Sequence, residues 1–196
     1  MSETWQDAWQ PVMDAVGQDL GDGATRFGPD AVELGSIRRW MEPLEFDCAL
    51  HYDRETAVEY GYSDVTAPYT SIVTFAIPAT WIPGRDVFTS ADRDAQPAFT
   101  PISKPDLALA PPTTGFFATG IEIDFLRPAV NGDRIGSRGF RLLSCVPKET
   151  SVGRGAFLTW QSELVDEEGN VLIRQRTATY AYNPFAAASD ALEESL

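Results

Sequence analysis

The first residues of the chain space their apolar side chains as an amphipathic helix does. Side chains three and four positions apart lie on one face of a helix, and this spacing is followed by Trp5, Trp9, Val12, Met13, Val16 and Leu20. Pro11 lies inside the pattern, so it either belongs to the first turn of the helix or kinks it. The stretch from Gly21 to Pro29 interrupts the pattern, and no regular element is predicted there.

Three more helices are predicted before the middle of the chain. The first ends near Pro43, and its apolar face consists of Ile37, Trp40, Met41 and Leu44. The next is short, because Asp53 is a suitable N-cap and Gly61 a suitable C-terminal stop. The last runs from Pro68 to Trp81 and starts with a proline, which the first helical turn tolerates. Since this helix is apolar on almost every side, we expect it to be buried.

The pattern changes to that of strands in the second half of the chain. Residues 82–114 are rich in proline and predict a long loop, which we interpret as an active-site or interface flap. Apolar and polar residues then alternate over 121–125 and 158–164, as in half-buried strands. Residues 166–170 form a turn signal before another strand at 171–182, so these last strands predict an antiparallel hairpin. Helices followed by a strand meander indicate an α+β fold.

Composition and charge narrow the range of partners. A chain of 196 residues with 43% hydrophobic and 22% charged residues is long enough for one sizeable core. The net charge of −14 disfavours binding to nucleic acid or to an anionic membrane. Cys48 and Cys145 are too few for a disulfide framework or a zinc site, so we expect a cytoplasmic protein without a metal. No segment of the sequence predicts export or a membrane span.

Short segments along the chain carry a family resemblance. They are Ile37–Glu42, Cys48–Asp53, Ala67–Thr70, Phe125–Asp133, Gly169–Ile173 and Ala178–Tyr182. They resemble the MaoC-like or FAS1-like dehydratase N-terminal hotdog family, which contains (R)-specific enoyl-thioester hydratases and dehydratases. The resemblance implies a single hotdog domain over residues 27–184, in which a long antiparallel sheet wraps around a buried central helix. Residues 1–26 would then be an N-terminal helical extension, and 185–196 an acidic, flexible tail.

The resemblance also implies roles for individual residues. His51 occupies the position of the family's catalytic histidine, a general acid or base. The family's aspartate, five residues before it, falls on Phe46, which carries no proton. The neighbouring Asp47 is therefore expected to assist or orient His51, although it could simply be a turn residue. Residues expected to bind the substrate are Cys48, Pro68, Tyr69, Thr70, Ser71 and Arg154.

Three functions stay open at this point. The first is reversible hydration or dehydration of an enoyl or 3-hydroxyacyl thioester at a site between two subunits of a homodimer or heterodimer. It needs no cofactor beyond the coenzyme A of the substrate. The second is a catalytically impaired, pocket-forming subunit of a heteromeric hydratase, because Ala67 and Pro68 at the helix start resemble non-catalytic halves; His51 would then be a packing residue. The third is a hotdog thioesterase, for which residues 68–81 lack the carboxylate that would activate water.

Overall fold

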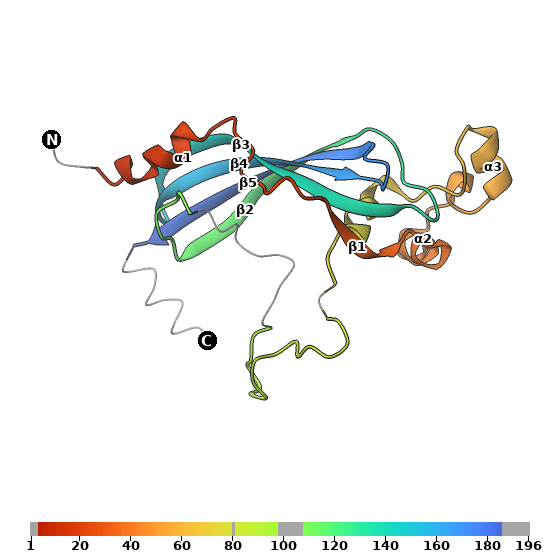
Figure 1. Ribbon diagram of the computed structural model, residues 1–196, viewed down its shortest axis with the longest axis horizontal. Helices are drawn as coiled ribbons and strands as arrows, with labels where there is room; N and C mark the ends of the chain where they lie inside the picture. The colour runs from red at the N-terminus through yellow and green to blue at the C-terminus, as the bar shows by residue number, and fades with distance from the viewer. Residues whose placement is uncertain (1–3, 80, 98–107, 186–196) are drawn as a thin grey trace.

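The computed structural model describes residues 4–79, 81–97 and 108–185, and its main element is a long five-stranded antiparallel sheet (Figure 1). The strands lie in the order β1-β3-β4-β5-β2. Their bounds are β1 Arg26–Ala31, β2 Gly115–Phe125, β3 Arg134–Thr150, β4 Gly153–Val165 and β5 Val171–Pro184. The β4–β5 hairpin pairs Val165 with Val171, which confirms the predicted turn between them. The strands predicted from the alternation at 121–125 and 158–164 are confirmed as parts of β2 and β4.

The helices are all short. They are the 3-10 helices η1 Asp7–Trp9, η2 Glu42–Leu44, η3 Ala49–His51 and η4 Tyr69–Ser71, and the α-helices α1 Gln10–Asp14, α2 Leu34–Met41, α3 Arg54–Glu59 and α4 Ile72–Phe75. Asp53 caps α3 as predicted, since its carboxylate accepts from the amides of Glu55 and Thr56. The Thr56 hydroxyl also donates to this carboxylate, and this bond is the main reason why the pKa of Asp53 is lowered.

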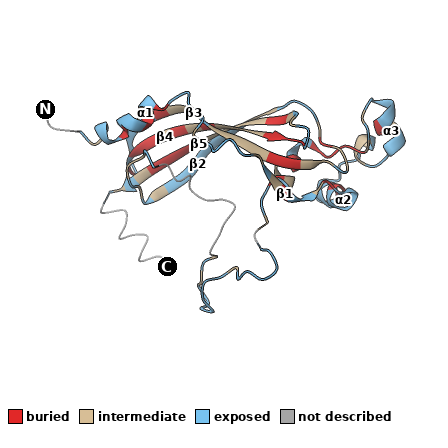
Figure 2. Cartoon of the chain, viewed as in Figure 1, coloured by how far each residue is buried: buried red, intermediate tan, exposed pale blue. Residues whose placement is uncertain are grey.

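Buried side chains of the helices and the sheet form two separate hydrophobic cores along the sheet. Buried residues are coloured red in Figure 2. Alternate residues of β4 point to the same face, and those that reach the cores are Ala156, Leu158, Trp160 and Leu164. At one end, Trp9 and Val12 of the N-terminal helices cover Leu158 and Trp160. At the other, Met41 of α2 and Ile72 of α4 belong to the cluster that contains Leu164. The arrangement is that of a hotdog domain, in which helices cover one face of a curled antiparallel sheet.

The N-terminal helix is shorter than its apolar spacing predicts. It ends at Asp14, because Gly17 has a φ of +90° and its amide donates to the carbonyl of Leu142. Val16 and Leu20 therefore lie beyond the helix. Pro11 belongs to the first turn of α1.

The predicted central helix from Pro68 to Trp81 is wrong in length and in burial. Regular structure covers only η4 and α4, from Tyr69 to Phe75. Pro78 explains the early end, since a residue before proline is pushed out of the helical region. Ile77 and Trp81 are 39% and 56% exposed, so the segment presents apolar side chains to solvent as well as to the core. Its buried positions are Pro68, Ser71, Ile72 and Ala76.

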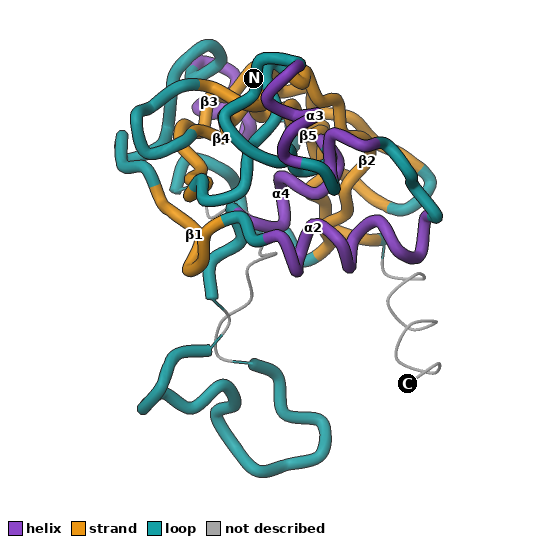
Figure 3. The backbone as a smooth tube through the Cα atoms, turned by 90° about the vertical axis from the view of Figure 1, so that its right-hand side faces the viewer, coloured by secondary structure: helices purple, strands orange, loops and turns teal. Residues whose placement is uncertain are grey.

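Other parts of the chain lie at the margins of the sheet. The described residues of the long loop contain no helix or strand, and residues 81–97 project away from the body (Figures 1 and 3). Residues 98–107 and the predicted tail from 186 lie outside the described residues, and the role of the loop as a flap stays a prediction. Strand β1 was not predicted, because Gly28 and Pro29 weaken a strand pattern and proline is confined to edge strands such as this one.

Candidate active site

His51 lies in η3, immediately before the capped helix α3, and its ring is bonded to Thr66. The Nδ1 atom of His51 is 2.7 Å from the main-chain oxygen of Thr66 and 3.0 Å from its Oγ1. The backbone around Thr66 is fastened to a neighbouring loop: Ala67 N donates to Ala129 O at 2.8 Å and Asn131 N to Val65 O at 2.9 Å. The only histidine of the chain is thus held beside the start of η4.

Phe46 and Asp47 are placed differently around this histidine. The ring of Phe46 lies 5.5 Å from that of His51, and its carbonyl oxygen accepts from the hydroxyl of Tyr52. Asp47 is exposed, and in the described part of the chain it makes no hydrogen bond or ion pair. Among the described residues no carboxylate bonds to His51 either. A single chain therefore holds the expected histidine without a carboxylate partner.

The hydroxyl groups of Thr70 and Ser71, predicted to bind the substrate at the helix start, make different hydrogen bonds. Ser71 is buried, and its hydroxyl donates to the carbonyl oxygen of Pro68 at 2.7 Å, which closes its own turn. The Thr70 hydroxyl is exposed and accepts from the indole Nε1 of Trp40 at 3.3 Å. Thr70 is therefore open to a ligand, whereas the Ser71 side chain is committed to the turn.

Aromatic side chains are exposed next to the histidine and at the start of η4. Tyr69 packs against Phe125, with ring centroids 5.1 Å apart, and partial burial raises the pKa of its phenol. Phe46 contacts His51, and Tyr52 bonds to Phe46. These aromatic residues, which we call the apolar rim, are each 40–49% exposed: Phe46, Tyr52, Tyr69 and Phe125. Exposed apolar surface next to a candidate site is typical of an interface or a ligand groove.

Arg154 lies away from this site, whereas Cys48 is close to His51 in the sequence. Arg154 lies at the start of β4, where it is paired with Asn183, and its side chain bonds to Glu149 at 2.6 Å. This is the end of the sheet opposite α3 (Figure 1), so one chain does not bring Arg154 to His51. Cys48 precedes η3 and is half-buried.

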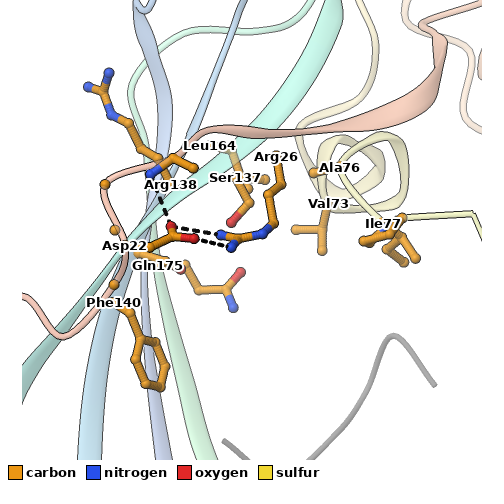
Figure 4. A pocket seen from close by; sticks show the side chains of 16 residues that line it. Asp22, Arg26, Val73, Ala76, Ile77, Ser137, Arg138, Phe140, Leu164 and Gln175 are labelled. Atoms are coloured by element: carbon orange, nitrogen blue, oxygen red, sulfur yellow. Dashed lines mark hydrogen bonds and ion pairs between the residues drawn. The ribbon is translucent and has the colours of Figure 1, made fainter. Parts of the chain in front are cut away.

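A separate cavity of about 310 Å³ lies at the C-terminal end of α4 (Figure 4). Val73 and Ile77 line it from the helix segment, and Phe140 and Leu164 line it from the sheet. At its mouth Asp22 and Arg26 form an ion pair at 2.5 Å, which lowers the pKa of Asp22. Pro78, which follows the end of α4, also lines the cavity. Nothing in the sequence pointed to Thr66, which meets His51 only through the fold.

Comparison with known families agrees with this geometry. The family model of the FAS1-like dehydratase domain region matches residues 24–175, which are most of the chain. The chain belongs to this family. The MaoC-like resemblance is thereby confirmed. A curated relative is the probable enoyl-CoA hydratase alpha subunit of Thermomonospora curvata, 28% identical over 171 residues, which cover 86% of this chain and 50% of the relative. The chain thus spans about half the length of that relative.

Solved structures confirm the fold of this FAS1-like dehydratase region. A chain of the ChsH1-ChsH2 complex from Mycobacterium tuberculosis superposes with a TM-score of 0.60 and 17% identity over 92% of each chain. The MaoC-like dehydratase from Rhodospirillum rubrum gives a TM-score of 0.51 and 19% identity, with 85% of this chain and 96% of that chain covered. Within the described residues, no helix is long and apolar enough to cross a membrane. The same residues contain no cluster of three or more metal-ligating side chains.

Proposed function

We propose that this chain supplies the thioester site of a hydratase or dehydratase, with His51 as the general acid and base. One observation carries the proposal: the only histidine of the chain is fixed through Nδ1 beside the start of η4, which leaves Nε2 for a reacting proton. The substrate would be a 2-enoyl thioester or its 3-hydroxyacyl counterpart, with coenzyme A as the carrier. This goes beyond the family assignment, which concerns dehydratase domains in general.

The chemistry needs one proton acceptor and one proton donor. In hydration, water loses a proton to the base as its oxygen bonds to the β-carbon, and a proton is delivered to the α-carbon. His51 would take the first proton through Nε2 and, as the general acid, deliver a proton to the α-carbon, so that it ends the cycle neutral; the reverse reaction uses the same atom. Negative charge develops on the thioester oxygen meanwhile. The amides of Tyr69 and Thr70 open η4 and have no intrahelical acceptor, so they are suited to this oxygen.

We further propose that a second hotdog subunit completes the site. His51 lacks a carboxylate in the described part of this chain, and the apolar rim around it is open. Strand β2 is an edge strand that pairs only with β5, so it can extend the sheet into a partner. The names of the relatives, an alpha subunit and a two-protein complex, support a heteromer.

Because Phe46 carries no proton, a second function is also considered, that of a pocket-forming subunit. Without the family's aspartate, the chain could form the acyl pocket of a heteromeric hydratase whose partner carries the catalytic groups. The two functions differ in one respect, which is whether turnover requires His51. The thioesterase alternative is less suitable, because residues 69–75 contain no carboxylate.

The decisive experiment replaces His51 with alanine in the chain and in its complex with a co-purified hotdog subunit. Loss of the enoyl-thioester absorbance measures turnover. We expect a decrease of at least about a hundredfold, the usual contribution of a positioned acid or base, with unchanged circular dichroism. Unchanged turnover would reject His51 as the catalyst and favour the pocket-forming role. Asp47→Asn is the matched variant: a tenfold loss would assign Asp47 a share in the proton transfer, and an unchanged rate would exclude it.

A further inference from the structure

Both hydrogen-bond donors of Thr66 are directed at one acceptor. Its amide donates to the main-chain oxygen of Leu50 at 3.0 Å, and its hydroxyl donates to the same oxygen at 3.2 Å. Thr66 is 2% exposed, so water does not compete for these groups. The carbonyl and hydroxyl oxygens of Thr66 are consequently left as acceptors only.

These two oxygens both face Nδ1 of His51, at 2.7 and 3.0 Å. A carbonyl oxygen cannot donate, so its 2.7 Å contact calls for a hydrogen on Nδ1, and a hydroxyl that donates to Leu50 can accept from the same hydrogen. An unprotonated Nδ1 would therefore set its lone pair against two oxygens. The arrangement is favourable only if Nδ1 carries the hydrogen, which in the neutral ring leaves the lone pair on Nε2.

We infer that Thr66 is a positioning residue that fixes the Nδ1–H tautomer of His51. The inference rests on the proposed function, because the tautomer matters for catalysis only if Nε2 accepts the proton. Free histidine in water favours the opposite tautomer, so the fold reverses its preference. Thr66 is a neutral partner. It orients the imidazole without adding the negative charge that a carboxylate would bring.

The single histidine makes the tautomer directly measurable. In the chain labelled with ¹⁵N-histidine, all imidazole signals come from His51. In the neutral ring, we expect a protonated-type shift for Nδ1 and an unprotonated-type shift for Nε2. The opposite pattern would overturn the inference, whatever the activity of the protein.

Variants of Thr66 test the side chain separately from the backbone carbonyl. Thr66→Val removes one acceptor and keeps the other, so the ratio of the Nδ1–H to the Nε2–H tautomer should decrease about two- to tenfold, the effect of one neutral hydrogen bond. In a complex that turns over, kcat should decrease by a similar factor with little change in KM. Thr66→Ser should restore both. Thr179→Val is the control, because Thr179 is also buried and its hydroxyl makes no hydrogen bond within the described residues.

Two outcomes separate this inference from the proposed function. If Thr66→Val changes neither the tautomer ratio nor kcat, the Thr66 hydroxyl has no positioning role. If the spectrum shows the Nδ1–H tautomer but the His51→Ala variant keeps its turnover, the tautomer assignment is supported and the catalytic role of His51 is rejected.

Discussion

The ring of Phe46 packs against the imidazole of His51, with centroids 5.5 Å apart and an angle of 36° between the planes. The family resemblance places an aspartate at the position of Phe46; on that alignment an aromatic face takes the place of a carboxylate next to the histidine. The ring can hold the imidazole in place, but it can neither take up a proton nor stabilise a charged imidazolium as a carboxylate would. The missing acid has to come from a partner, or the chain works without one.

Restoring the carboxylate tests this relationship. Phe46 is 45% exposed and belongs to neither hydrophobic core, so Phe46→Asp leaves both cores intact. If the chain turns over slowly because His51 lacks an acidic neighbour, the variant should raise kcat about tenfold or more. The enoyl-thioester assay measures it. Leu44→Asp, at a position in η2 that is 64% exposed, adds the same charge two residues earlier and should leave kcat unchanged. Equal rates for both variants and the wild type would show that His51 does not need a carboxylate at position 46.

The free edge of the sheet leads to a prediction about assembly. Ile121 is 61% exposed on β2, the strand that pairs only with β5. Lysine on an edge strand opposes pairing with another chain. Ile121→Lys should therefore shift the chain or its complex toward monomers in light scattering coupled to size exclusion. Val16→Lys is the control, since Val16 is 41% exposed and lies outside the sheet. If the molar mass of the assembly in solution is unchanged by Ile121→Lys, the interface does not lie at the β2 edge.

Strand β1 depends on a close approach between Gly28 and the end of α4. A Cβ atom at Gly28 would lie 1.9 Å from the main-chain oxygen of Phe75, so one of the two backbones would have to move. Gly28→Ala should lower the free energy of unfolding by about 1–3 kcal/mol, as overpacking does. Gly35→Ala, on α2 with open space around it, should instead stabilise by up to about 1 kcal/mol. Urea denaturation measures both, and equal effects would contradict the close packing.

The sequence predicted the parts of this fold that depend on local patterns. Alternation over residues 121–125 and 158–164, and the cap at Asp53, describe single elements, and all are confirmed. The length of the central helix was overestimated, because its apolar composition was given more weight than Pro78. The bonds of Thr66 could not be predicted, because they join positions 15 residues apart through a turn that only the folded chain defines.

The two cysteines should differ in reactivity. Burial raises the pKa of the Cys145 thiol to about 11, whereas Cys48 is half-buried beside η3. Only the thiolate is alkylated rapidly. At pH 8 iodoacetamide should therefore label Cys48 and spare Cys145 in the folded chain, and label both in urea, as read by mass spectrometry. Because the folded thiol stays protonated while an unfolded one ionises, this group favours the folded state less as the pH rises from about 9 to about 11. Rapid labelling of Cys145 at pH 8 would contradict its burial.

The cavity at the end of α4 is placed to receive the distal part of an acyl group, if His51 holds the thioester at the other end of the helix. Its lining includes Val73, Ile77 and Phe140, which suit an apolar group. Ser162→Leu adds bulk to the cavity floor. KM for long or bulky enoyl thioesters should then increase about tenfold or more, while that for a four-carbon substrate stays the same, because a hydrophobic pocket discriminates by size. Gln161→Leu is the control, since residue 161 points to the opposite face of β4. Equal changes for short and long substrates would exclude the cavity as the acyl site and leave the substrate at the apolar rim.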